Sequence, residues 1–136
     1  MAIVVGYVPT KEGRAALRHA AQECELRKSR LIVINSVRGG TTYDAQEASR
    51  FEGELSQVQE RLDAAGLEHE VRQLVRDNEP AEDLLEVADS VDAEFIVIGL
   101  RRRTPVGKLI LGSNAQRILL DASCPVLAVK AGPDDE

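Results

Sequence analysis

Short runs of aliphatic, mostly β-branched residues alternate along this chain with longer amphipathic stretches, and this alternation restricts the fold more than any other feature. The short runs predict five strands, namely Ala2–Tyr7, Leu31–Val37, Glu68–Val75, Ala93–Gly99 and Val126–Val129. Between them, apolar residues at three- and four-residue spacing predict helices in Glu12–Lys28, Thr41–Ala65, Ala81–Ser90 and Ser113–Asp121. Alternating strands and helices imply parallel strands joined by right-handed crossovers, so a single α/β domain is expected.

The composition supports a buried parallel sheet and excludes several partners. Of 136 residues 43% are hydrophobic but only 3% aromatic, and Trp is absent, so the core must be aliphatic. Few aromatic residues also argue against a protein that stacks the bases of single-stranded nucleic acid. The formal net charge of −6 disfavours binding to nucleic acid or to an anionic membrane, because both need a positive surface.

The cysteines and histidines offer no metal site and no catalytic group. Cys24 and Cys124 lie far apart, with no CxxC pair and no histidine at ligand spacing, which predicts two reduced thiols. His19 and His69 lie on an expected helix and an expected outer strand, so neither forms a nucleophile–base constellation. The chain also begins directly with a strand and has no apolar run of membrane-spanning length, so we expect a soluble cytoplasmic protein without catalytic residues.

The segment after the fourth strand has the features of an anion-binding loop. The run Ile96–Gly99 ends in glycine and is followed by Arg101-Arg102-Arg103, by Gly107 and by Gly112-Ser113-Asn114 at a helix start. A helix N-terminus supplies free N–H groups and a positive dipole, and arginines supply bidentate donors to phosphate oxygens. From Gly99 to Leu120 there is no acidic residue, whereas Lys108 and Arg117 add to the arginines. The sequence therefore predicts a phosphate site in this segment.

Open α/β sheets bind ligands at the carboxyl ends of their strands, where the strand order reverses. The ends of the first and fourth strands, Gly6–Thr10 and Gly99 onward, are the expected place.

With these motifs, the chain resembles the universal stress protein family over essentially its full length. The residues that carry the resemblance are Val4-Val5-Gly6, Arg14-Ala15-Ala16-Leu17, Glu79-Pro80-Ala81-Glu82, Phe95–Gly99, Leu109–Ser113 and Ala122–Leu127. The resemblance implies an open, Rossmann-like sheet of five parallel strands in the order 3-2-1-4-5, with helices on both faces. The domain would span residues 1–131, and residues 132–136 would form an acidic tail.

Nucleotide-binding members of the family are similar in a loop written GxxGx(9)G(S/T). Here Gly99 matches the first glycine and Gly112-Ser113 the last pair, but Arg102 stands at the middle glycine. Members that bind ATP also tend to carry an Asp-Gly-Ser turn after the first strand, which here is Val8-Pro9-Thr10. Arg102 restricts the backbone yet can itself contact phosphate, and Val8 removes an acceptor for the ribose. The resemblance implies a nucleotide site formed by Gly6, Tyr7, Val8, Thr10, Val37, Gly99, Arg101, Arg102, Arg103, Gly112, Ser113 and Asn114.

Several of these residues also have purely structural interpretations. Tyr7 and Cys24 suit packing, Thr10 suits the cap of the first helix, and Cys124 suits a small buried hydrophobe. The Asn114 amide at the helix start suits contact with a phosphate, and the sequence leaves open whether it makes one.

The expected function is binding of an adenine nucleotide such as ATP or AMP, with no required cofactor and with Mg²⁺ accompanying ATP. The resemblance also implies a homodimer through the last strand, formed by Val126, Leu127, Ala128 and Val129. Two alternatives stay open: a dimeric interaction module that binds no nucleotide, and a slow nucleotide hydrolase.

Overall fold

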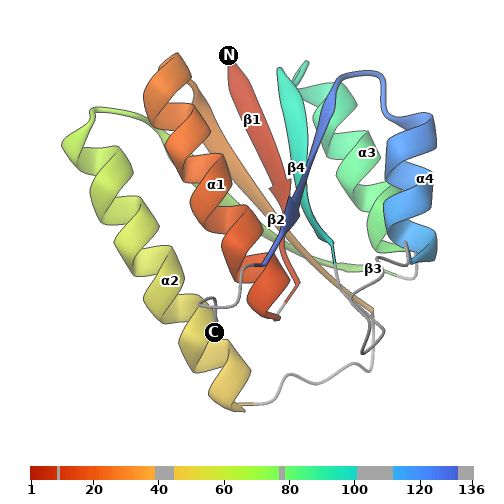
Figure 1. Ribbon diagram of the computed structural model, residues 1–136, viewed down its shortest axis with the longest axis horizontal. Helices are drawn as coiled ribbons and strands as arrows, with labels where there is room; N and C mark the ends of the chain where they lie inside the picture. The colour runs from red at the N-terminus through yellow and green to blue at the C-terminus, as the bar shows by residue number, and fades with distance from the viewer. Residues whose placement is uncertain (9, 39–44, 77–78, 101–111, 132–136) are drawn as a thin grey trace.

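The computed structural model describes residues 1–8, 10–38, 45–76, 79–100 and 112–131, with the backbone alone at 36–38, 45, 47–48 and 74–76. A five-stranded parallel sheet has the order β3-β2-β1-β4-β5 (Figure 1). Its strands are β1 (Ala2–Gly6), β2 (Arg30–Arg38), β3 (His69–Arg76), β4 (Phe95–Leu100) and β5 (Val126–Lys130). The helices among the described residues are α1 (Lys11–Arg27), α2 (Ala45–Ala64), α3 (Pro80–Ser90) and α4 (Ser113–Asp121). The predicted fold class and strand order are confirmed.

The start of β4 differs from the prediction, because the end of α3 uses residues that the apolar pattern had assigned to the strand. Asp92 takes a left-handed conformation with φ of 53°, and the Ala93 N–H donates to the Ala88 carbonyl at 3.0 Å. Ala93 therefore closes the helix end, and β4 begins at Phe95.

Two helices cover each face of the sheet. In Figure 1, α1 and α2 lie on one side and α3 and α4 on the other. Ile3 and Val5 of β1 pack with Leu17 of α1, whereas Val4 points the opposite way, into the cluster that contains Leu84 of α3. The central strand is thus buried on both faces, as expected for a parallel sheet.

The layer formed by α1 and α2 combines apolar packing with charged contacts. Val58 and Leu62 of α2 are buried against α1, and the Tyr7 ring stacks on Phe51 with the centroids 4.0 Å apart. Ion pairs Arg18–Glu54 and Arg61–Glu25, each at 2.8 Å, join the two helices. The interpretation of Tyr7 as a packing residue is therefore confirmed.

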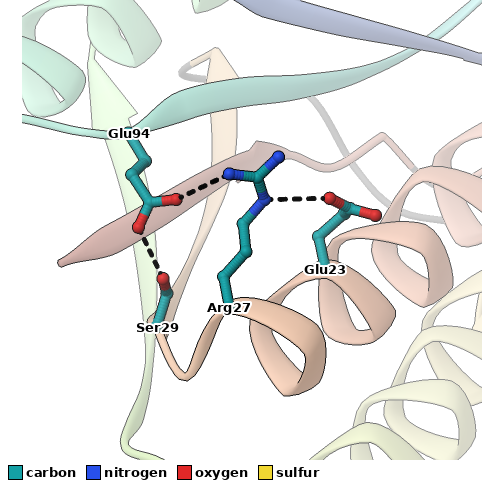
Figure 2. Close-up of polar contacts among 4 residues, drawn as sticks. All are labelled: Glu23, Arg27, Ser29 and Glu94. Carbon is teal, nitrogen blue, oxygen red and sulfur yellow. Dashed lines mark hydrogen bonds and ion pairs between the residues drawn. The ribbon is translucent and has the colours of Figure 1, made fainter.

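A polar cluster ties the end of α1 to the start of β4 (Figure 2). The Arg27 guanidinium donates to Glu23 at 3.1 Å and to Glu94 at 3.4 Å, and the Ser29 hydroxyl donates to Glu94 at 2.7 Å. The guanidinium also lies 5.0 Å from the centroid of the Phe95 ring. Because Arg27 is exposed, this cluster orients the elements more than it stabilises the fold.

The two thiols lie in different surroundings. Cys24 is fully buried in the core, as predicted, and this burial, with the Glu94, Glu23 and Glu25 carboxylates, raises its pKa from 9.0 to about 12. Cys124 is half-buried rather than buried, because it precedes the edge strand β5; burial and the nearby Asp89 raise its pKa as well.

The buried Cys24 thiol predicts an alkaline loss of stability. Below pH 9 the thiol is neutral in both the native and the unfolded state, so its contribution to the free energy of unfolding is fully present. As the pH rises from 9 toward 12, the thiol ionises in the unfolded chain before it ionises in the native protein. The free energy of unfolding therefore falls by at most about 1.4 kcal/mol per pH unit. We expect the difference in unfolding free energy between wild type and Cys24→Ala, measured in urea from pH 7 to 11, to shrink above pH 9. A difference that does not change with pH would contradict the assignment.

Candidate functional site

A hollow of about 140 Å³ lies at the carboxyl ends of β1 and β4, next to Ile34 of β2 and the N-terminal turns of α3 and α4. In Figure 1 these strand ends lie in the lower half of the molecule. The residues that line the hollow are Gly6, Tyr7, Val8, Ile34, Pro80, Ala81, Leu84, Ile98, Gly99, Asn114, Ala115 and Ile118. This is the edge at which an open α/β sheet binds its ligand, as the sequence predicted.

The walls of the hollow are mainly aliphatic. The sheet contributes Ile34 and Ile98, and the helices contribute Leu84 and Ile118 from the opposite side. No carboxylate and no cationic side chain occurs among the described residues of this lining. Such walls suit a flat, uncharged group, and any charge on the ligand must lie outside them.

Two of the predicted glycines lie in close packing at this site, and backbone contact makes glycine necessary at Gly99. A Cβ at Gly99 would lie 2.3 Å from the Glu12 carbonyl oxygen, because the end of β4 contacts the first turn of α1 backbone to backbone. A Cβ at Gly6 would lie 2.9 Å from Leu84 Cδ2, which forms part of the wall. These glycines allow close packing whether or not a ligand is bound.

The turn after β1 contacts the first turn of α1. One of the residues in this contact, Gly13, was not predicted from the sequence. The Thr10 hydroxyl accepts a hydrogen bond from the Gly13 N–H at 3.1 Å, which confirms Thr10 as the helix cap. A Cβ at Gly13 would lie 1.9 Å from the Val8 carbonyl oxygen, so glycine is required there too. The signal available in the sequence was a glycine in the first turn of a helix.

The N-terminus of α4 receives no side-chain cap from its cap residue. Gly112 is the cap residue and makes no side-chain hydrogen bond, and Ser113, the first helical residue, is exposed. The first N–H groups of α4 therefore receive no acceptor from the cap residue, and the helix dipole places partial positive charge at this end. Gly112 and Ser113 thus lie at a helix start, and their role in binding stays a prediction.

Two polar residues of α4 contact α3. Asn114 lines the hollow, but its Oδ1 atom accepts a hydrogen bond from the Ala81 N–H at 3.3 Å. Arg117 lies 2.7 Å from Glu82 and 3.6 Å from Asp121, and the hydrogen bond to Glu82 raises the pKa of its guanidinium. Arg117, which the sequence placed among the cations of the anion-binding segment, is therefore paired on the surface.

The remaining predicted site residues fall in two groups. Val37 lies near the carboxyl end of β2, paired with Val75 of β3. Arg101, Arg102, Arg103, Lys108 and the tail 132–136 lie outside the described residues, so their roles stay predictions.

A second, larger hollow of about 420 Å³ lies at the amino ends of β2 and β3. Polar side chains of its lining contact one another: His69 lies 3.0 Å from Asp63, and Arg30 lies 3.9 Å from Glu70. We place the site at the smaller hollow, because ligands of open α/β sheets bind at the carboxyl ends. In the part of the chain that the structure describes, no group of three or more His, Cys, Asp or Glu side chains could hold a metal ion. Across those same residues, no helix combines the length and apolar character needed to cross a membrane.

Known proteins are similar to this chain in sequence and in fold. A family model of the universal stress protein family matches residues 1–130. A universal stress protein of Mycolicibacterium smegmatis is 48% identical over 128 residues, which cover 94% of this chain and 96% of that protein. The chain belongs to the universal stress protein family.

Two solved structures carry bound nucleotides. The universal stress protein from Archaeoglobus fulgidus in complex with dAMP is 33% identical, with a TM-score of 0.67 and coverage of 96% of this chain and 98% of that one. A universal stress protein in complex with cAMP is 26% identical, with a TM-score of 0.68 and coverage of 97% and 98%.

The contact at Gly99 predicts a stability effect that does not depend on any ligand. We expect Gly99→Ala to lower the unfolding free energy by at least about 1–3 kcal/mol, because the new methyl group must displace the Glu12 carbonyl. Gly53→Ala in α2 is the matched control, since no atom lies within 4 Å of its added Cβ and alanine favours a helix by about 0.5–1 kcal/mol. Urea unfolding without nucleotide measures both, and equal values for the two variants would contradict the packing role.

Proposed function

We propose that this protein binds an adenine mononucleotide at the carboxyl edge of the sheet, as part of a cytoplasmic regulatory role in the stress response. The observation that carries the proposal is an aliphatic hollow that adjoins an N-terminus of α4 without a side-chain cap. The complexes of family members with dAMP and cAMP support an adenine nucleotide as the ligand class.

The base occupies the aliphatic hollow. A volume of about 140 Å³ is well below the ~300–1,000 Å³ of sites that enclose a drug-sized ligand, so it suits one part of a nucleotide. An uncharged heterocycle fits between Ile34 and Ile98 on the sheet and Leu84 and Ile118 on the helices. The sugar and phosphate then extend toward Gly112 and Ser113.

The phosphate is bound at the N-terminus of α4. The helix dipole and the first N–H groups of α4, which Gly112 leaves without a side-chain acceptor, favour an anion there, and guanidinium groups of Arg101, Arg102 or Arg103 add charge-assisted contacts. Val8 offers no acceptor to the ribose hydroxyls, and each hydrogen bond so lost costs about 0.5–1.5 kcal/mol. We therefore propose a binder of roughly tenfold lower affinity than a site with a carboxylate at that position.

We propose binding rather than catalysis. The histidines lie away from the hollow, on the exposed side of α1 and at the amino end of β3, and the described lining of the hollow contains no histidine and no carboxylate. No cofactor is required, and Mg²⁺ would accompany ATP alone. Phosphate release from ATP at no more than an incidental rate agrees with this proposal, and rapid turnover would overturn it.

A variant that fills the hollow tests where the base binds. Ala115 lines the hollow and is half-buried, so Ala115→Leu places three more carbon atoms in the space for the base. We expect AMP binding, measured by calorimetry, to weaken at least tenfold. Ala64→Leu, at the exposed end of α2, is the control and should bind as wild type does. Wild-type protein without measurable affinity for AMP, ATP or cAMP would overturn the proposed function and favour the interaction module.

We further propose that two copies associate through β5. This strand has β4 as its one neighbour and carries few charges, with Leu127 38% exposed and Leu120 of the adjacent α4 82% exposed. The opposite edge strand, β3, carries the paired charges Glu70 and Arg72. Charged side chains protect a strand edge from pairing, whereas an apolar edge favours it.

Introducing one glutamate on each edge strand of the sheet, in separate variants, tests the proposed dimer. We expect wild type to be a dimer at micromolar concentration in sedimentation, and Leu127→Glu to be a monomer, because the dimer would bury two new carboxylates. Val71→Glu, on β3 at 36% exposure, should leave the dimer intact. A wild-type monomer, or dissociation by Val71→Glu instead, would contradict the assignment.

A further inference from the structure

The cap residue of helix α3 gives the first turn of the helix no side-chain acceptor. Its first residue is Pro80, which has no N–H, and the cap residue Glu79 makes no side-chain capping hydrogen bond. The first N–H of the helix therefore belongs to Ala81, which is fully buried. A buried N–H without an acceptor is costly, so this donor must be satisfied from elsewhere in the fold.

The acceptor comes from α4. Asn114 lies 33 positions further along the chain, and its Oδ1 atom lies 3.3 Å from the Ala81 nitrogen. Asparagine is among the residues best suited to cap a helix N-terminus, since its carbonyl oxygen accepts from the first free N–H groups. Here it performs that role across two helices instead of within one.

A second contact links the same two helices one residue further along α3. Arg117 of α4 lies 2.7 Å from Glu82 of α3. Both side chains are exposed, so this ion pair adds little stability, but with the cap it restricts both the distance and the rotation between the two N-terminal turns.

The linked turns form two walls of the hollow. Pro80, Ala81 and Leu84 line it from α3, and Asn114, Ala115 and Ile118 line it from α4. We infer that Asn114 is a positioning residue: its side chain caps α3 and holds the α3 wall at the distance from α4 that the base requires, and it does not contact the ligand phosphate. The ligand in this inference rests on the proposed function, whereas the cap itself rests on the contact to Ala81.

Two roles for Asn114 make different predictions for ligands with and without phosphate. A residue that sets the width of the hollow affects adenosine and AMP equally, because both insert the same base. A residue that binds phosphate affects AMP and leaves adenosine unchanged. A local cap for α3 satisfies the Ala81 N–H but does not rejoin α3 to α4, so it restores the protection of Ala81 without restoring the width of the hollow.

The experiment compares Asn114→Ala, Glu79→Ser and the double variant, with Ser113→Ala as the control on α4. Amide hydrogen exchange of Ala81 without ligand reports the cap directly. We expect exchange about fivefold faster in Asn114→Ala, matching a cap worth about 1 kcal/mol, and unchanged exchange in Ser113→Ala. The serine at position 79 supplies its own acceptor, so the double variant should recover the protection of Ala81.

Binding of adenosine and AMP, measured by calorimetry, completes the test. We expect Asn114→Ala to weaken both ligands by the same factor, about fivefold, and the double variant, in which α3 is capped locally but not joined to α4, to bind as weakly as Asn114→Ala. Unchanged exchange at Ala81, or weaker binding of AMP alone, overturns the inference. If wild type binds neither ligand, the proposed function fails, and the exchange rates at Ala81 by themselves then support or overturn the cap from α4.

Discussion

The central position of β1 is the constraint on which the rest of the structure depends. Its residues pair with β2 on one side and β4 on the other, and its side chains alternate between two buried layers. Backbone groups buried so deeply must be hydrogen-bonded, and here the sheet satisfies them. Because the chain leaves β1 toward β2 on one side and later reaches β4 on the other, the carboxyl ends of these strands diverge into helices on opposite faces. The hollow forms at that divergence.

Close backbone contacts beneath the hollow change how its glycines are interpreted. Gly99 matches the first glycine of the nucleotide loop, yet the Glu12 carbonyl leaves no space for a Cβ whether or not a ligand is present. Gly13 is required in the same way by the Val8 carbonyl. A glycine at either position is therefore explained by packing, and evidence for ligand binding must come from the hollow and from the N-terminus of α4.

Two polar side chains near the hollow also have partners that the order of residues in the sequence does not indicate. Arg117 pairs with Glu82, and Asn114 accepts from Ala81, so these two side chains of α4 join it to α3. Positive potential at the proposed phosphate position then depends on the helix dipole and on the arginines at 101–103. In a protein with a net charge of −6, this local arrangement suits a small anion rather than an extended polyanion.

The sequence by itself determined the element types, their order and the edge of the sheet that carries the site, because apolar periodicity and turn residues are local properties. It also identified Thr10 as a cap and Cys24 as a core residue, since both follow from position within one helix. Only the tertiary structure decided that α4 caps α3, that Gly99 contacts Glu12 and that Cys124 stays half-buried. The first two features join residues that are distant in the chain, and the third depends on which strand lies at the edge of the sheet. Both depend on how whole helices and strands pack, which no local pattern in the sequence determines.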